Sequence, residues 1–432
     1  MLSIKYLHEN REEAIRRLAV KGFKGEQIID ELLGLDNDRR DSQRRLDENL
    51  AEQNKISKSI GLLMKEGKRD DAEVAKAQIA SLKEGSKQME SRKKELEDRI
   101  LNLIVQIPNL PADIVPEGTK AEDNVCVKEG GCMPHLTDEC KLPHWEVVKN
   151  YDLIDFEVGV KITGAGFPLY KGYGARLQRA LISFFLDSAR EAGYLEVMPP
   201  YVVNEDSAYG TGQLPDKEGQ MYHAQTDNLY LIPTAEVPVT NIFRDVILEE
   251  KSLPVCLTAY SACFRREAGS YGKDVRGLNR LHQFDKVEIV RVDKPEHSYT
   301  SLQEMVDYVQ SLVDKLELPW RILRLCGGDM SFTSALTYDF EVFSAAQERW
   351  LEVSSVSNFE SFQANRLKCR YRDAEGKVQV AHTLNGSALA LPRIVAALLE
   401  NNQTPEGIRI PKALVPYTGF DIIPLPKEPS PF

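Results

Sequence analysis

The sequence predicts an α+β protein with an N-terminal antiparallel helical-hairpin arm followed by a domain built on a mainly antiparallel sheet. Residues 28–106 contain no proline or tryptophan and are rich in Lys, Arg, Glu and Asp, as expected for long exposed helices. Beyond Tyr173, short β-branched or aromatic runs recur among helical stretches. Several connections between these runs are too short for the crossover helices of parallel strands, which favours antiparallel pairing.

A heptad-like pattern predicts the hairpin. In its second half, mostly apolar or small residues recur at steps of four and three: Ala75, Ile79, Leu82, Ser86, Met89, Lys93, Leu96, Ile100 and Leu103. The first half has a poorer seam: Leu46, Leu50, Gln53, Ser57, Ile60 and Met64. A polar turn over residues 65–70 separates the halves, and Pro108 ends the second helix. Such an arm is roughly 50 Å long at about 1.5 Å per residue.

The pattern alone leaves the purpose of this arm open. A dimerising or spacer coiled coil is the simplest interpretation, because acidic and basic residues are nearly balanced along it. Basic clusters at 39–40, 44–45 and 92–94 could instead form patches that face phosphates, which would favour RNA binding.

We expect three parts in the chain: residues 1–110 as the N-terminal domain, 111–170 as a Gly- and Pro-rich linker, and 171–432 as the second domain. Before the hairpin, a short helical segment has these core candidates: Leu7, Ile15, Leu18 and Val20. In the second domain an amphipathic helix is predicted over 177–192. Strands are predicted at 201–203, 229–232, 286–292 and 378–381.

Composition limits the location of the protein. No run of about 18 apolar residues occurs, and the N-terminus becomes charged before a signal core could form. Seven cysteines without a CxxC pair favour reduced thiols. We therefore expect a cytoplasmic protein without a membrane partner. The net charge of -11 argues against a nucleic-acid partner only weakly, because it does not say where the charges lie.

One group of residues resembles a zinc site by composition alone: Cys126, Cys132, His135, Cys140 and His144. Their spacing matches none of the usual zinc-binding patterns. A solvated loop is the better interpretation, and no structural zinc is expected.

Four clusters in the second domain could carry chemistry. Thr234 and Glu236, two apart on what would be an extended segment, offer a hydroxyl and a carboxylate to a small polar ligand, although a helix N-cap fits the same residues. Residues 264–288 form the richest cluster, in which two strand-like pieces flank a glycine-rich loop with four arginines. Arginine side chains suit phosphate oxygens, and glycines let the backbone approach a nucleotide.

The other two clusters are weaker on their own. Glu352 and Ser355 could supply hard oxygen ligands to Mg²⁺ beside phosphates, but a serine-rich turn is the more probable structure there. The run 384–394 places Arg393 at the entry to an apolar helix, where it could face a nucleotide or lie on the surface.

Together these clusters resemble class II aminoacyl-tRNA synthetases, and among them the bacterial-type seryl-tRNA synthetases, over essentially the whole chain. Phe264 to Glu267 with Gly277 to Glu288 is similar to motif 2 of that family, and Gly386 to Arg393 to motif 3. The run 174–203, with Pro199-Pro200, is similar to the motif 1 dimer element. The resemblance implies a homodimer with a class II catalytic domain, and an arm that binds tRNA by its shape.

The resemblance also implies the site residues. The ATP site would contain Arg265, Arg266, Glu267, Arg280, Leu281, Phe284, Glu352, Val353, Ser354, Ser355 and Arg393. The serine site would contain Thr234, Ala235, Glu236, Glu288, Asn385 and Ser387. Mg²⁺ would be bound with ATP by Glu352 and Ser355, and catalysis would depend mainly on Arg265, Glu352 and Arg393. Asn365 departs from the family, whose members usually have a second arginine at that place.

The implied reaction is activation of serine with ATP, followed by transfer to the 3′ end of tRNA(Ser), with tRNA(Sec) as a further substrate in the family. Two alternatives remain. An amino-acid:carrier-protein ligase has a similar core, but it lacks the tRNA-binding arm and uses zinc. A non-catalytic synthetase-like RNA-binding protein would need a broken site, whereas Arg265, Glu288 and Arg393 are present.

Overall fold

A computed structural model describes residues 1–216, 218–267 and 276–426. The chain divides into two compact units, residues 1–19 with 23–108 and residues 20–22 with 109–432. No helix among the described residues is both long and apolar enough to cross a membrane.

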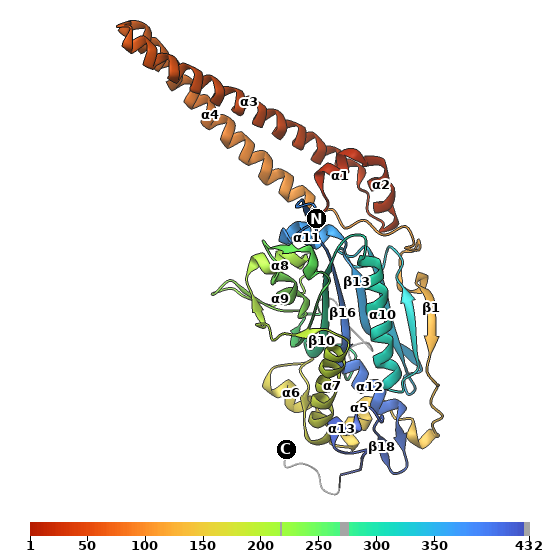
Figure 1. The fold of residues 1–432 in the computed structure, drawn as a ribbon. Coiled ribbons are helices and arrows are strands. Elements are labelled where there is room, and N and C mark those ends of the chain that lie inside the picture. The colour runs from red at the N-terminus through yellow and green to blue at the C-terminus, as the bar shows by residue number, and fades with distance from the viewer. Residues whose placement is uncertain (217, 268–275, 427–432) are drawn as a thin grey trace. The chain divides into compact units, whose positions relative to one another are not determined.

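The first unit is helical, as predicted (Figure 1). Its helices are α1 (Ile4–Glu9), α2 (Arg11–Val20), α3 (Glu26–Lys65) and α4 (Arg69–Ile104). The long helices α3 and α4 pack against each other as a hairpin. The predicted seam of α4 is confirmed, because each of its nine residues is buried or half-buried.

The predicted seam of α3 was wrong at three positions. Leu50, Ser57 and Met64 are exposed, whereas the residues just before them, Asn49, Ile56 and Leu63, are buried or half-buried. A polar contact decides the register: the Asn49 side-chain oxygen accepts hydrogen bonds from the Ser86 hydroxyl (2.9 Å) and from the Gln53 amide (2.7 Å). Gln53 also donates to Ser86 (2.7 Å). Hydrophobicity alone favoured Leu50 as the seam residue at this level of the hairpin. The structure instead has a polar layer of Asn49, Gln53 and Ser86 there.

The second unit is built on an eight-stranded sheet in the order β1-β11-β12-β13-β16-β10-β9-β4. In that order the strands are Val125–Gly130, Trp320–Arg324, Leu336–Ser344, Arg349–Asn358, His382–Ala390, Gln283–Asp293, Val255–Phe264 and Leu195–Glu196. All neighbours pair antiparallel except β4 and β9, which are parallel. The prediction of a mainly antiparallel sheet is confirmed.

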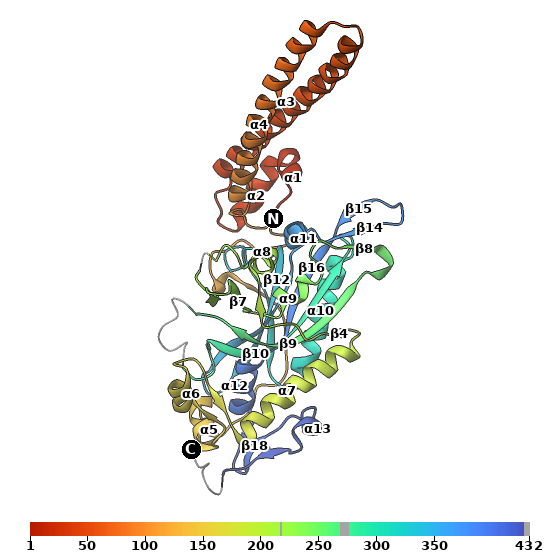
Figure 2. The ribbon, with the colours of Figure 1, turned by 90° about the vertical axis from the view of Figure 1, so that its left-hand side faces the viewer.

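Small sheets and helices surround this sheet (Figure 2). The short strands are β2 (Ile154–Asp155), β3 (Leu169–Tyr170), β5 (Val202–Val203), β6 (His223–Ala224), β7 (Leu229–Leu231), β8 (Ile247–Glu249), β14 (Arg370–Arg372), β15 (Val378–Val380), β17 (Gln403–Thr404), β18 (Gly407–Arg409) and β19 (Ile422–Ile423). The helices are α5 (His144–Asn150), α6 (Phe156–Ile162), α7 (Gly172–Glu191), α8 (Glu205–Thr211), α9 (Glu236–Asn241), α10 (Ser298–Lys315), α11 (Ser361–Leu367), α12 (Leu391–Asn401) and α13 (Val415–Thr418).

Helices cover the two faces of the sheet differently. The apolar sides of α7, α10 and α12 form the main core with one face, to which β10 contributes Val287 and Ile289. The shorter helices α9 and α11 pack with Val290 and Val292 in a second core. Because side chains alternate along a strand, Glu288 lies on the face of Val290 and Val292, away from the main core. This second face carries the candidate site.

The solvated loop predicted around the cysteines was wrong in part. Residues Val125–Gly130 form strand β1 at the edge of the sheet, and Cys140 and His144 are buried. Among the described residues, no group of three or more His, Cys, Asp or Glu side chains is arranged to hold a metal.

Candidate active site

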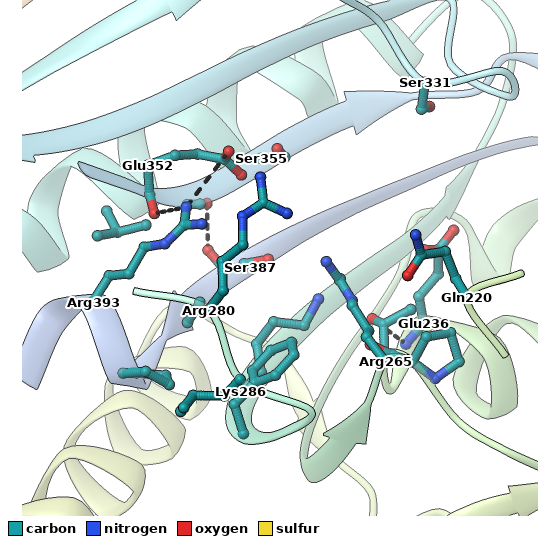
Figure 3. A pocket seen from close by; sticks show the side chains of 18 of the residues that line it. Gln220, Glu236, Arg265, Arg280, Lys286, Ser331, Glu352, Ser355, Ser387 and Arg393 are labelled. Carbon is teal, nitrogen blue, oxygen red and sulfur yellow. Dashed lines mark hydrogen bonds and ion pairs between the residues drawn. The ribbon is translucent and has the colours of Figure 1, made fainter. Parts of the chain in front are cut away.

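A cavity of about 560 Å³ opens on the second face of the sheet. Most of the predicted site residues line it: Thr234, Glu236, Arg265, Glu267, Arg280, Leu281, Phe284, Glu352, Val353, Ser354, Ser355, Asn385, Ser387 and Arg393. Gln220 and Glu236 lie at one end, whereas Glu352 and Arg393 lie at the other (Figure 3). Three predicted residues do not line the cavity, namely Ala235, Arg266 and Glu288. The glycine-rich part of the loop, residues 268–275, lies outside the described residues.

The Glu236 end of the cavity contains two buried carboxylates. Thr234 and Glu236 sit in a turn that enters α9, so the extended segment predicted for them was wrong. The Thr234 hydroxyl donates to Glu288 Oε2 (3.0 Å), and it accepts from the backbone N–H of Glu236 (3.2 Å). This turn therefore brings both carboxylates to one place.

Glu288 is almost fully buried beneath Thr234. Its Oε2 also pairs with Lys286, whereas Oε1 has no hydrogen-bond partner within the described part of the chain. Burial raises the pKa of Glu288, although Lys286 and Thr234 oppose the shift. A buried carboxylate oxygen without a partner is costly, so it is a natural place for a cationic group of a ligand.

Glu236 is held by residues that the sequence did not single out. Gln363, on α11, donates to Glu236 Oε1 (2.7 Å) and accepts from the Thr383 hydroxyl (2.7 Å). Burial, and then the nearby charge of Glu288, raise the pKa of Glu236 to about 7. Lys286 and Gln363 were missed because each stands among other polar or charged residues in the sequence, where no local signal distinguishes it from a surface residue.

Three arginines line the cavity, with Arg265 beside Glu236, and Arg280 and Arg393 towards Glu352 (Figure 3). The Arg265 guanidinium lies 5.2 Å from the centre of the Phe284 ring. Arg280 pairs with Glu267 (3.0 Å). Arg393, at the start of α12, donates to the backbone oxygens of Glu352 (2.8 Å) and Asn279 (3.0 Å). Three guanidinium groups around one cavity can bind several phosphate oxygens.

Glu352 and Ser355 lie on strand β13, so the serine-rich turn predicted there was wrong. A bulge at Val353 leaves Phe340 opposite Ser354, and Glu341 opposite Glu352. Residues three apart on a regular strand point to opposite faces, but the extra residue of the bulge allows Glu352 and Ser355 both to line the cavity.

The Ser355 hydroxyl is oriented by a buried acid. It donates to Asp339 Oδ1 (2.5 Å), which leaves its lone pairs available to a ligand. Burial, and then the charge of Glu352, raise the pKa of Asp339 well above its ordinary value.

Known proteins resemble this chain along its whole length. Residues 1–111 match the family model for the seryl-tRNA synthetase N-terminal domain, and residues 220–402 match that for the tRNA synthetase class II core domain (G, H, P, S and T). A protein from Salinibacter ruber named serine--tRNA ligase is 50% identical over 97% of this chain and 98% of its own length. One from Chlorobaculum parvum with the same name is 45% identical over 98% of this chain and all of its own length.

Solved structures agree with these sequence relatives. The crystal structure of seryl-tRNA synthetase from Pyrococcus horikoshii complexed with ATP superposes with a TM-score of 0.91 at 32% identity, covering 99% of this chain and 100% of that one. The cytoplasmic serine-tRNA ligase from Naegleria fowleri, in complex with AMP, gives a TM-score of 0.86 at 25% identity, with 99% of each chain covered. The chain belongs to the seryl-tRNA synthetase family of class II aminoacyl-tRNA synthetases.

Proposed function

We propose that this chain is a serine--tRNA ligase, which activates L-serine with ATP and transfers it to the 3′ end of tRNA(Ser). The observation that carries the proposal is the buried Glu288 carboxylate: its Oε1 is unpaired, and its Oε2 accepts from Thr234, which lines a cavity that also contains three arginines. That arrangement suits a small amino acid placed next to a polyphosphate. It also agrees with the names of the relatives.

Serine would be recognised at the two carboxylates. The α-ammonium group would pair with Glu288, whose Oε1 has no other partner in the described structure. Thr234, Glu236, Asn385 and Ser387 would surround the remainder of the substrate. A buried site that hydrogen-bonds a hydroxyl discriminates strongly against alanine, because its own polar groups would otherwise stay unpaired.

The arginines would bind ATP and stabilise the transition state. Arg265, next to the serine end, would hold the α-phosphate, Arg280 the outer phosphates, and Arg393 one face of the adenine, with Phe284 on the other. The serine carboxylate would attack the α-phosphorus in line, with pyrophosphate as leaving group. The 3′-hydroxyl of the tRNA would then attack the seryl-adenylate carbonyl and release AMP. Positioning and charge stabilisation account for catalysis, without a covalent enzyme intermediate.

Mg²⁺ would be held by Glu352 and Ser355 together with ATP phosphates. Their oxygens are the hard ligands that Mg²⁺ prefers, and the hydrogen bond from Ser355 to Asp339 turns the serine lone pairs outward. When bound, the ion would offset negative charge on the phosphates.

The hairpin of α3 and α4 would bind the tRNA. Its acidic and basic residues are paired along the helices, for example Arg44 with Asp41 (2.6 Å) and Glu48 (2.9 Å). Such a surface suits recognition of RNA shape and backbone better than a uniformly basic one would. The same contacts would admit tRNA(Sec), so charging assays should include both transcripts.

A second copy of the chain would complete the enzyme as a homodimer. Large apolar side chains near the Pro199-Pro200 pair are exposed: Leu195 (65%), Met198 (86%) and Val202 (43%). Exposed apolar residues gathered in this way are typical of protein interfaces.

The cytoplasm is the compartment that we propose. Each of the seven cysteines is unpaired, and Cys126 and Cys132 are exposed. Exposed free thiols are compatible with a reducing compartment.

Amino-acid-dependent ATP–pyrophosphate exchange, run with all twenty amino acids and without tRNA, tests the proposal. Exchange with serine alone is expected. Exchange with a different amino acid would overturn the assignment of the serine pocket, and no exchange at all would favour a non-catalytic RNA-binding protein.

A further inference from the structure

A buried pair outside the cavity, His144 and Glu400, is not used by the proposed mechanism. Both side chains are fully buried. His144 Nδ1 lies 2.7 Å from Glu400 Oε1, and the backbone N–H of His144 donates to the same oxygen (2.9 Å). Hydrogen bonds from His144 and Ser344 lower the pKa of Glu400 although burial opposes them, so the carboxylate is ionised at neutral pH. A buried, ionised carboxylate with several hydrogen bonds restrains the positions of the groups that donate to it.

The other ring nitrogen of His144 contacts the loop that precedes β10. The backbone N–H of Leu278 donates to His144 Nε2 (2.8 Å). A backbone N–H can only donate, so Nε2 is the acceptor and Nδ1 carries the proton that is donated to Glu400. A Cβ on Gly277 would lie 2.2 Å from Nε2, so the loop can approach the imidazole only because this residue is glycine. Both ring nitrogens are therefore committed to hydrogen bonds.

A second route joins Glu400 to the cavity. Gln347 donates to Glu400 Oε1 (3.0 Å) and accepts from the Asn279 side chain (3.0 Å). The backbone oxygen of Asn279 in turn accepts from Arg393 (3.0 Å). Leu278, Asn279 and Arg280 line the cavity, whereas His144, Gln347 and Glu400 do not.

We infer that His144, anchored by Glu400, is a positioning residue that fixes segment 278–280 and, through Asn279, Arg393 at the ATP end of the cavity. This inference deepens the proposed function and rests on it for the identity of the ligand. The residues proposed to bind serine, Thr234, Glu236 and Glu288, have no hydrogen bond with the His144–Glu400 pair among the described contacts. Loss of the pair should therefore change ATP binding and leave serine binding unchanged.

Two substitutions test separately the two hydrogen bonds of the His144 imidazole, one with Glu400 and one with Leu278. In His144→Asn, the amide nitrogen can replace Nδ1 and still donate to Glu400, but no atom reaches Leu278. In His144→Gln, the longer side chain can place its oxygen near the position of Nε2 and accept from Leu278. We expect His144→Asn to raise the KM for ATP by about tenfold, the usual effect of one lost hydrogen bond, with the KM for serine unchanged. The rise in KM should exceed any fall in kcat, and His144→Gln should restore much of the ATP affinity.

The KM values and kcat are measured by pyrophosphate exchange. Active-site titration gives the concentration of functional enzyme, so that misfolded protein is excluded from the comparison. Unchanged KM for ATP in His144→Asn, equal losses in both variants, or a parallel rise in the KM for serine would each overturn the inference. If His144→Asn does not fold, Gln347→Leu breaks the second route at a half-buried position. It should raise the KM for ATP alone, and a normal value would overturn the inference.

Failure of the proposed function would be recognised separately. It would appear as no serine-dependent exchange in the unmodified protein. The same variants would then be compared by calorimetry with a non-hydrolysable ATP analogue, where weaker binding to His144→Asn than to His144→Gln is still expected. Equal affinities would overturn the inference.

Discussion

Replacing Glu236 with glutamine should make the protein more stable above neutral pH and weaken its activation of serine. Glu236 is buried at the end of the cavity with a pKa raised to about 7 from an ordinary value of 4.5. The folded state thus binds the proton more tightly than the unfolded state does. The stability that this carboxyl contributes is fully present below pH 4.5 and is lost as the pH rises through about 7.

The magnitude follows from the shift. A difference of roughly 2.5 pKa units at 1.36 kcal/mol each amounts to about 3 kcal/mol at pH 8. Glutamine has nearly the same shape, does not titrate, and can still accept the hydrogen bond from Gln363. We therefore expect Glu236→Gln to be more stable than the parent by up to about 3 kcal/mol at pH 8, and to differ little from it at pH 5.

Unfolding by urea at pH 5 and pH 8 measures this difference. Glu375→Gln, at the exposed tip of the β14–β15 hairpin, is a matched control in which no such gain is expected. Serine-dependent exchange by Glu236→Gln should fall by about tenfold to a hundredfold, because a charged hydrogen-bond acceptor is lost. The reasoning is refuted if the variant gains no stability at pH 8, or gains as much at pH 5.

Four further predictions concern other parts of the molecule. Glu288→Ala should lower serine-dependent exchange by at least about a hundredfold, since it removes one partner of a buried pair, with the oligomeric state on gel filtration unchanged; normal exchange would contradict its role. Glu352→Gln should raise the Mg²⁺ concentration for half-maximal exchange, and an unaltered Mg²⁺ dependence would exclude it as a ligand. The Ser42 hydroxyl donates to the backbone oxygen of Met89 (3.5 Å), so a short glycine linker can replace residues 43–88 between them. This replacement should spare exchange but abolish tRNA charging; equal loss of both would argue against the arm as the tRNA-binding element. Met198→Asp should convert the proposed dimer to monomers in sedimentation velocity, and an intact dimer would place the interface elsewhere.

The sequence predicted the elements of this protein better than their local detail. The α4 seam was predictable because its apolar spacing is regular, whereas in α3 the register depends on a contact of Asn49 with Ser86, which no pattern within α3 contains. Likewise, the serine-rich run at Glu352 resembles a turn by composition, but pairing with β12 and β16 makes it a strand. In both cases the deciding contact comes from a segment distant in the chain.

The candidate site shows the same limit. Its arginines and glycines cluster within short motifs, so their convergence on one cavity could be anticipated from the resemblance. Gln363 and His144 act only through partners far away in sequence, at Glu236 and Glu400. Each one has a fixed role only once the sheet has brought these segments together, and so neither could be assigned from the sequence.

The uneven burial along the α3–α4 hairpin has a consequence for how the arm opens. Six large aliphatic residues are buried at the inner end of the hairpin, where α3 begins and α4 ends: Ile29, Leu32, Leu35, Leu96, Ile100 and Ile104. Beyond the Asn49–Ser86 layer, only Ile56 and Ala72 are buried in the two helices. Local opening costs least where few apolar contacts are lost, so backbone amides of the outer half should exchange with solvent well before those of the inner half. The outer half can thus bend or separate to fit a bound surface while the inner half stays folded.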